Sequence, residues 1–423
     1  MSPTQFSGWR DGLRYGLMGL PLAFVALPLY VILPNHYARE FGVPLATLGA
    51  ILLGARLFDA VIDPVLGRWS DRLFARSSRA VLVFSAVAAL LLALGFAGLF
   101  FPLASGPQAL LIWVTVLLVL TYAAYSAVSV AHQSWGAMLG GDETQRSRIV
   151  AWREGLGLLG VLLASVAPVA FGLPGTVALF ALTLAVGWAA WTQAAQPQTR
   201  PTFKTAHIGL PFAYPAFRRL LLVFMLNGIA SAIPATLILF FVQDRLQAPQ
   251  AMEPVFLGSY FLCAALTIPL WLKLVQHIGL ARTWGVGMVL SVVVFAFATQ
   301  LGAGDTVGFI AVCALAGVAL GTDLALPPAL LAGVIFETGD RGRAEGAYFG
   351  WWNFATKLNL ALAAGLALPL LGAFGYAPGV RSEAALQALV TAYCVVPCVL
   401  KLAALTALYV LIIRPASVPG KAV

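Results

Sequence analysis

The chain has 423 residues, of which 61% are hydrophobic and 10% are charged, with a mean hydropathy of +0.92. A water-soluble protein of this length cannot bury so much apolar surface, whereas a lipid bilayer removes it from water directly, so the composition excludes a soluble globular protein. The net charge of +9 does not indicate nucleic-acid binding, because the Lys and Arg residues lie in short loops between apolar runs.

Twelve apolar runs are long enough to cross a bilayer as helices, which takes roughly 20 residues. The first run has no A-x-A-like cleavage pattern, so no cleaved signal peptide is expected. The sequence therefore predicts an all-α membrane protein of twelve transmembrane helices, near 12–34, 45–68, 80–101, 108–138, 148–172, 176–195, 215–243, 254–276, 282–302, 307–336, 344–373 and 385–413.

The long polar interruption between Gln196 and Pro215 divides these runs into two sets of six. It predicts an N-terminal six-helix bundle (1–195), a cytoplasmic linker (196–214) and a C-terminal six-helix bundle (215–423). The halves resemble each other: a shift of 205 residues places Pro64 on Pro269 and Arg68 on Lys273. Such pseudo-symmetric halves are typical of alternating-access transporters with a substrate site near the bilayer midplane.

Basic residues are distributed unevenly over alternate loops. Nineteen of the 25 Lys and Arg fall on one side, and only Arg39, Arg245 and Arg381 fall on the other. By the positive-inside rule, both termini are expected in the cytoplasm, and the expected location is a bacterial inner (plasma) membrane. The remaining three basic residues, Arg56, Lys357 and Lys401, lie inside predicted helices.

Two carboxylates in the second run, Asp59 and Asp63, are four residues apart and so share one helix face; Arg56 precedes them on the same side. A charge at bilayer depth is costly, so these side chains are expected to face the bundle interior or a wet cavity. Acidic oxygens there suit a proton or a small hard cation such as Na⁺. The alternative is an Arg–Asp pair that only locks helices, but two acids beside one base favour a cation site. The 205-residue shift places Ala264 and Ile268 at the corresponding positions, so this site belongs to the first half.

The four cysteines all fall in apolar runs, and no His or acid joins Cys394 and Cys398 as a metal site would require, so packing is the better interpretation. The sequence contains no nucleophile elbow, His/acid metal cluster or phosphate loop, so an enzyme is not expected. A membrane sensor or assembly partner that does not transport is a further alternative.

The segment Gly67-Arg-Trp-Ser-Asp71-Arg72, with Arg76 and Arg79 following, resembles the loop 2/3 signature of the major facilitator superfamily. The resemblance implies a fold of two six-helix bundles, in which Gly67, Asp71 and Arg72 latch helix ends in one conformation. A solvated charged loop is the alternative.

Arg56-x-x-Asp59-x-x-x-Asp63-Pro64 resembles, more narrowly, the helix-2 motif of the glycoside–pentoside–hexuronide:cation symporters, the melibiose permease family. The resemblance implies that Asp59 and Asp63 serve the coupling cation (Na⁺ or H⁺), that Arg153 lies near the site and that Lys357 lies between the cation and the sugar. It runs over nearly the whole chain and includes the stretches Trp135-Gly-Ala-Met, Asp142 to Arg148, Ala151-Trp-Arg153-Glu154, Gly321 to Pro328 and Arg343 to Lys357.

The chain departs from galactoside-transporting members of that family, which hold sugar hydroxyls with an Asp in helix 1 and another in helix 4. Neither predicted helix contains an acid here, so the sugar assignment is weaker than the family assignment. Trp135, Trp351 and Trp352 are candidates for an aromatic sugar platform, with ordinary packing as the alternative. The candidate polar contacts are Gln133, Ser129, Asn353 and Asp323.

Four further polar residues lie within predicted helices. His132 is either a packed, hydrogen-bonded histidine or a proton or substrate contact. Asp323, shortly before Pro327-Pro328, has functional and structural interpretations of equal weight. Lys357 needs a partner, and displacement of Lys357 from Asp59 or Asp63 by a cation would be a coupling device. Lys401 is expected to snorkel.

Together these features predict cation-coupled symport of a small solute, most simply a sugar or glycoside. A lysolipid or other amphiphile transporter of the same fold is the alternative. The expected partners are a small-molecule substrate, the cation and the bilayer; no other cofactor and a monomer are expected.

Overall fold

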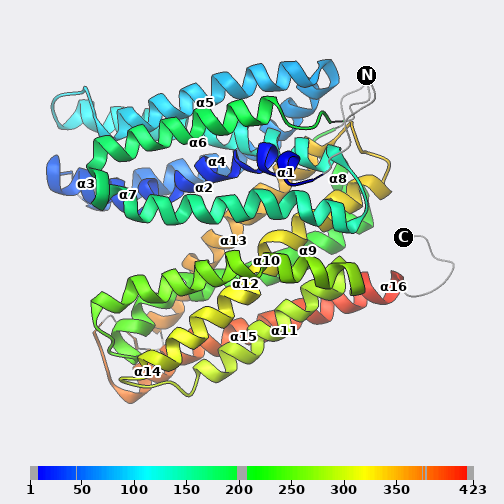
Figure 1. The fold of residues 1–423 in the computed structure, drawn as a ribbon. Helices are drawn as coiled ribbons and strands as arrows, with labels where there is room; N and C mark the ends of the chain where they lie inside the picture. Colours follow the sequence, from blue (N-terminus) through cyan, green and yellow to red (C-terminus); the bar gives the residue numbers. More distant parts are fainter. Residues whose placement is uncertain (1–7, 44, 198–206, 374, 377–378, 417–423) are drawn as a thin grey trace. The chain divides into compact units, whose positions relative to one another are not determined.

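The computed structural model describes residues 8–43, 45–197, 207–373, 375–376 and 379–416 (Figure 1). Regular structure in these ranges is helical throughout, without strands. Eight helical segments there are long and apolar enough to cross a membrane: Ser78–Phe100, Pro107–Leu139, Glu143–Thr192, Pro215–Arg245, Glu253–Ile278, Leu280–Ala298, Thr306–Glu337 and Glu383–Ile413.

The predicted count of twelve spans is not established by these eight. One helix, α7 (Glu143–Thr192), covers the two predicted runs 148–172 and 176–195. The predicted break between them coincides with a kink at Gly172, where φ is +67° and the backbone is not helical. Glycine reaches this left-handed region without steric cost, and Pro174 follows it.

The chain divides into two compact units, residues 1–213 with 335–354 and residues 214–334 with 355–423. The first border lies at the end of the predicted linker 196–214, whose residues 198–206 are outside the described ranges. The other borders fall inside two helices, so the end of α12, the following loop and the start of α13 belong to the first unit. The predicted domain limits at 195 and 215 stay a prediction.

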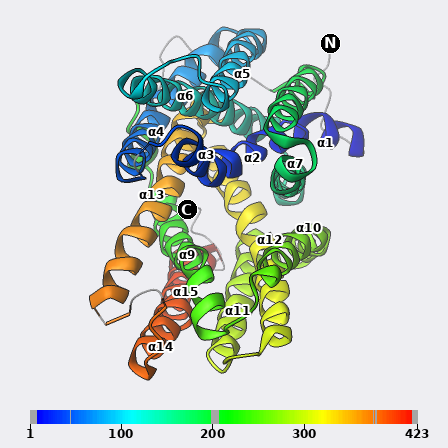
Figure 2. The same ribbon diagram turned by 90° about the vertical axis from the view of Figure 1, so that its left-hand side faces the viewer.

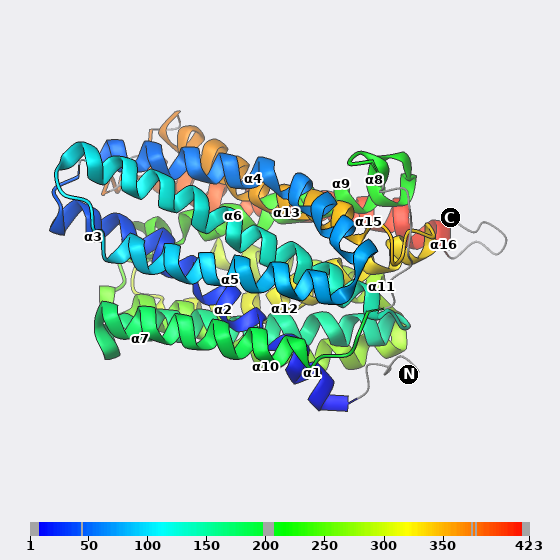
Figure 3. The same ribbon diagram turned by 90° about the horizontal axis from the view of Figure 1, so that it is seen from above.

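The first unit begins with short helices that divide the first predicted run. Long helices follow, and α4, α5 and α6 lie side by side (Figures 2 and 3). Side-chain caps define two helix starts: Ser77 Oγ accepts the Ala80 N–H before α5, and Asp142 Oδ1 accepts the Gln145 N–H before α7. The elements are α1 (Gly8–Gly16), α2 (Gly19–Phe24), a π-helical turn (Pro28–Ile32), α3 (Leu33–Glu40), α4 (Leu45–Arg76), α5 (Ser78–Phe100), α6 (Pro107–Leu139), α7 (Glu143–Thr192) and α8 (Leu210–Ala213).

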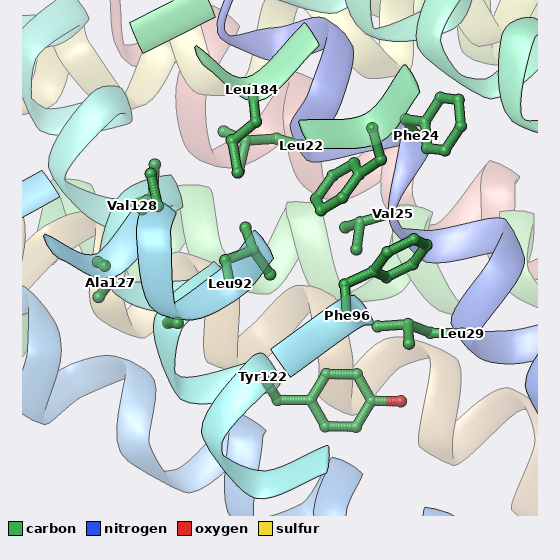
Figure 4. Packing of buried hydrophobic residues seen from close by; sticks show 14 of the residues in the cluster. Leu22, Phe24, Val25, Leu29, Leu92, Phe96, Tyr122, Ala127, Val128 and Leu184 are labelled. Atoms are coloured by element: carbon green, nitrogen blue, oxygen red, sulfur yellow. The ribbon is translucent and has the colours of Figure 1, made fainter. Parts of the chain in front are cut away.

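Apolar side chains from α2, α5, α6 and α7 meet in the interior of this unit (Figure 4). The Phe96 ring lies 4.5 Å from the Phe180 ring between centroids, and the Phe24 ring lies 5.8 Å from Phe180. These contacts fix α2 and α5 against α7. Because α5 also packs against α4 and α6, they help to position the helices that carry the polar residues.

The second unit contains the remaining helices except for the end of α12 and the start of α13, and α15 packs between α9 and α11. Gly279, at φ +81°, separates α10 from α11, and the Phe241 and Tyr393 rings stack at 4.3 Å in the core. The elements are α9 (Pro215–Phe240), a π-helical turn (Phe241–Arg245), a 3-10 turn (Gln250–Met252), α10 (Glu253–Ile278), α11 (Leu280–Ala298), α12 (Thr306–Glu337), α13 (Glu345–Ala373), α14 (Glu383–Val390), a π-helical turn (Thr391–Val395), α15 (Val396–Leu408), a π-helical turn (Tyr409–Ile413) and α16 (Arg414–Ala416).

Candidate functional site

The two acids of the predicted cation site are buried in α4. Asp59 is 3% exposed and Asp63 is fully buried, whereas the Arg56 side chain is exposed. The carboxylates are therefore directed into the unit, as the cost of burying charge in lipid requires. Arg56, three residues before Asp59 on the same helix, is more exposed than either acid, and its role beside them stays a prediction.

Ser126, on the neighbouring helix α6, donates its hydroxyl hydrogen to Asp59 Oδ1 at 2.7 Å. Ser126 is 1% exposed, so this bond lies in the interior of the first unit. A hydroxyl oxygen can also serve as a cation ligand, so Ser126 joins the candidate residues of the predicted cation site, where sequence analysis did not place it. Its only signal in the sequence is a hydroxyl within a predicted apolar helix.

Asp71, of the predicted latch, caps the start of α13. Its Oδ1 accepts the Gly346 N–H at 2.6 Å and its Oδ2 accepts the Ala347 N–H at 2.9 Å. These are backbone groups of the first helical turn, which have no partner within their own helix. A carboxylate there also interacts favourably with the positive end of the helix dipole.

Gly67 allows the backbones of α4 and α13 to touch. A Cβ added to Gly67 would lie 2.0 Å from the Gly346 carbonyl oxygen, and one on Gly350 would lie 2.6 Å from the Asp63 carbonyl oxygen. Small residues four apart on α13 thus let α4 approach, a common packing mode of membrane helices. Arg72, the third predicted latch residue, is exposed.

The pKa of the Asp71 carboxyl gives a testable pH dependence. Asp71 lies beyond the predicted span 45–68; burial raises its pKa well above the usual value, the Glu345 charge raises it further, and the two backbone N–H donors oppose the rise. Because the folded-state pKa exceeds the unfolded value of about 3.9, this contribution to stability is present at low pH and is lost as the pH rises through the folded pKa.

We therefore expect Asp71→Asn to cost about 1 kcal/mol at acidic pH, through a weakened cap, and progressively less as the pH rises from there through the raised pKa of Asp71. Thermal unfolding of the purified protein across this range measures the difference. Asp142→Asn, which alters the exposed cap of α7, is the matched control. A pH-independent gap between wild type and Asp71→Asn would contradict the raised pKa.

His132 is packed against Tyr15. The two rings stack at 4.3 Å, His132 Nε2 lies 2.9 Å from the Tyr15 carbonyl oxygen, and the Tyr15 hydroxyl donates to the His132 carbonyl at 3.1 Å. A carbonyl only accepts, so Nε2 carries the hydrogen in this contact. These contacts match the first interpretation of His132, a packed and hydrogen-bonded histidine. Tyr15, its partner, lies near the end of α1, just before the break between α1 and α2.

Trp135 and Gln133 lie on the same helix as His132. Trp135 is fully buried, donates from Nε1 to the Ala195 carbonyl at 3.0 Å and packs edge-to-face with Trp191. Gln133 donates to Ser129 Oγ at 3.3 Å, and its own Oε1 is buried without a hydrogen bond from the described residues. Trp135 is thus enclosed by protein here, while Gln133 retains an acceptor for a ligand.

Arg153, on α7, is half-buried and forms an ion pair with the adjacent Glu154. A Cβ on Gly19 would lie 2.3 Å from the Arg153 carbonyl oxygen, so α2 runs directly against this part of α7. The structure places Arg153 in the same unit as Asp59 and Asp63. Its role near a cation stays a prediction.

In the second unit, Asp323 of α12 forms an ion pair with Lys401 of α15, with Lys401 Nζ 2.7 Å from Asp323 Oδ2. Lys401 is only 4% exposed, so the expectation that it snorkels to the surface is wrong. Its ammonium stays inside because the partly buried Asp323 carboxylate neutralises it, and snorkelling would break this ion pair. Asn227 and Trp284 also donate to Asp323 Oδ1, at 3.0 and 2.9 Å.

The other predicted residues of α13 fall in different places. Trp352 is buried and Asn353 is half-buried, both in the part of α13 that groups with the first unit. Lys357 is half-buried in the part that groups with the second unit. Its pairing with Asp59 or Asp63 stays a prediction. Within the described ranges, no cluster of three or more His, Cys, Asp or Glu residues could hold a metal ion.

Comparison with known families identifies the class of this protein. A family model described as MFS/sugar transport protein matches residues 14–414, nearly the whole chain. The chain belongs to this family. The resemblance drawn from the motifs is thus confirmed at this level, and the MFS/sugar transport protein is an integral, multi-pass membrane protein with a transporter fold. No curated protein matches the chain.

Solved structures share the fold of this MFS protein. The crystal structure of a bacterial homologue of the iron transporter ferroportin, in an outward-facing state, matches with a TM-score of 0.71 at 14% identity, covering 95% of this chain and 98% of that one. A single-residue variant of the E. coli fucose:proton symporter FucP matches with a TM-score of 0.67 at 14% identity, covering 92% and 98%. At these identities the likeness shows the fold alone.

Proposed function

We propose that this MFS protein is a secondary active transporter that couples entry of a cation, Na⁺ or H⁺, to symport of a small solute by alternating access. The observation that carries the proposal is the pair of buried acids one helical turn apart on α4, with Ser126 donating to Asp59. A buried carboxylate needs a counter-charge or a proton, and a transported cation supplies either.

The motif resemblance favours the melibiose permease-like symporters, and so a sugar or glycoside as the solute. The family description, sugar transport protein, and the likeness of fold to a fucose:proton symporter point the same way. In this proposal the chain forms twelve transmembrane helices in two pseudo-symmetric bundles, in a bacterial inner membrane with both termini cytoplasmic. Gly67, Asp71 and Arg72 would act as the conformational latch, and Arg153 and Lys357 would tune the cation site.

The test uses proteoliposomes loaded with a pH dye and a Na⁺ indicator. A panel of glycosides, pentoses, uronides and lysolipids is added to wild type, Asp59→Asn and Asp63→Asn. Asparagine keeps the shape of aspartate but removes the charge, so we expect a solute that drives cation entry in wild type to lose this coupling in both variants, by about a hundredfold or more. The dye that responds identifies the cation.

Asp305→Asn, which alters an exposed loop acid that accepts the Gly302 N–H, is the matched control and should transport normally. Solute-driven cation entry that is equal in wild type and both helix variants would make the carboxylates structural. A response to lysolipids alone would replace the sugar by an amphiphile within the same fold.

A further inference from the structure

A cavity of about 230 Å³ is lined entirely by residues of the second unit. The acids of α4 belong to the first unit and do not line it. Side chains of α9, α10, α11, α12 and α15 surround it, together with Tyr393 of the π-helical turn before α15. Most of the wall is apolar or aromatic, including Phe261, Phe295 and Pro397. The Asp323–Lys401 ion pair forms one part of that wall.

The carboxylate of this pair is fully provided with donors. Oδ1 accepts from Asn227 and Trp284, and Oδ2 accepts from Lys401 at 2.7 Å and from Ser231 at 3.2 Å. Donors from three helices thus hold Asp323 as a fixed anion. Asp323 has little acceptor capacity left for a ligand, so it acts as the anchor of Lys401.

The Lys401 ammonium group, unlike the carboxylate, has hydrogen-bond donors that remain unused. An ammonium has three N–H donors, and among the described residues Lys401 makes one hydrogen bond, to Asp323. The residue is 4% exposed and lines the cavity, so a molecule inside the cavity lies next to it. An acceptor oxygen inside the cavity would satisfy a donor that the fold leaves unused.

The charge of the ion pair and the size of the cavity limit the kind of molecule that can carry such an acceptor oxygen. Asp323 already neutralises Lys401, so an anion or a cation would bring an uncompensated charge into an apolar cavity. A sugar would leave several hydroxyls unpaired against apolar walls. A cavity of about 150 Å³ accommodates benzene, so this one accommodates roughly ten heavy atoms.

We propose that this cavity is a binding site for a neutral, largely apolar molecule with one acceptor oxygen, which Lys401 Nζ binds while the aromatic and aliphatic wall encloses the rest. The site is separate from the proposed cation site, and its existence does not depend on sugar transport. It gives the second half of the chain a ligand of a different class from a sugar.

Fluorine NMR of the purified protein in lipid nanodiscs tests the proposal with three probes of matched size. The probes are 2-(4-fluorophenyl)ethanol, 1-ethyl-4-fluorobenzene, which lacks the hydroxyl group, and 4-fluorophenylacetate, which is an anion. We expect the alcohol to bind saturably. The hydrocarbon and the anion should each bind at least roughly tenfold more weakly than the alcohol. Protein-dependent line broadening separates binding from partition into lipid.

Two variants localise the binding. Ala316→Phe fills the cavity from α12 about two helical turns from Asp323, and should abolish saturable binding of the alcohol. Asp323→Asn/Lys401→Met removes the ammonium donor together with its counter-charge. The affinity of this variant for the alcohol should fall to the affinity of wild type for the hydrocarbon. Thermal unfolding identifies any variant that has lost its fold.

The proposal is overturned if the alcohol does not bind saturably, or binds equally to folded Ala316→Phe. It is also overturned if the hydrocarbon or the anion binds as tightly as the alcohol to wild type. Cation-coupled uptake by the same nanodisc preparation, reconstituted into liposomes, is measured in parallel. Loss of coupling in Asp59→Asn with unchanged alcohol binding would separate the two sites.

Discussion

Lys401→Met is expected to destabilise the protein by about 3 kcal/mol, the lower end of the range for a broken buried ion pair, because it leaves the partly buried Asp323 carboxylate without its counter-charge. Asn227, Ser231 and Trp284 still donate to the carboxylate, but they carry no charge. Methionine has nearly the same volume as lysine, so little of the loss comes from packing. Denaturant unfolding of the purified protein in mixed micelles measures the change.

The double variant Asp323→Asn/Lys401→Met should recover most of this loss, because it removes both charges. Lys273→Met, which changes an exposed lysine on α10, should stay within about 0.5 kcal/mol of wild type. If the single and double variants were equally unstable, the loss would belong to the shape of the site, and the ion pair would contribute no net free energy.

Gly67→Ala is expected to cost about 3 kcal/mol, the upper part of the range for overpacking. The new Cβ would lie 2.0 Å from the Gly346 carbonyl oxygen, which belongs to a backbone and cannot rotate away. Either α13 moves from α4 or the helices distort, and both outcomes disturb the Asp71 cap. Unfolding temperature and the pH dependence of stability are the measurements.

Gly54→Ala on the same helix is the matched control. A Cβ there meets no atom within 4 Å, and alanine favours the helix by about 1 kcal/mol over glycine, so this variant should be as stable as wild type or more so. Equal behaviour of the Gly54 and Gly67 variants would mean that α4 and α13 do not pack this closely in the membrane.

Much of the fold follows from local sequence. Apolar run length predicted where most long helices lie, and even the break near residue 172 was predicted, because Gly172 and Pro174 interrupt the helical pattern locally. The division of the first run into α1, α2 and α3 was not predicted, since hydropathy alone does not register short irregular turns. The grouping of residues 335–354 with the first unit depends on contacts distant in sequence, which no local pattern contains.

The site was predictable only in part for the same reason. Burial of Asp59 and Asp63 follows from the cost of charge in lipid, but the donor to Asp59, Ser126, lies 67 residues away. The partner of Lys401 lies 78 residues away, so a rule based on one helix assigned this lysine to the surface. Trp135 shows a further limit: aromatic residues that line a site and those that fill a core have the same sequence pattern.

The grouping of residues 335–354 with the first unit has a consequence during synthesis. Asp71 and the backbone amide it accepts from are separated by 275 residues, and ribosomes add about 5–20 residues per second. Helices α4 to α7 are therefore synthesised on the order of tens of seconds before the segment that completes their packing exists. During that interval Asp71 lacks its helix terminus and Gly67 faces no neighbouring backbone. A nascent chain arrested before residue 335 should consequently be more sensitive to membrane proteases than one arrested after residue 354.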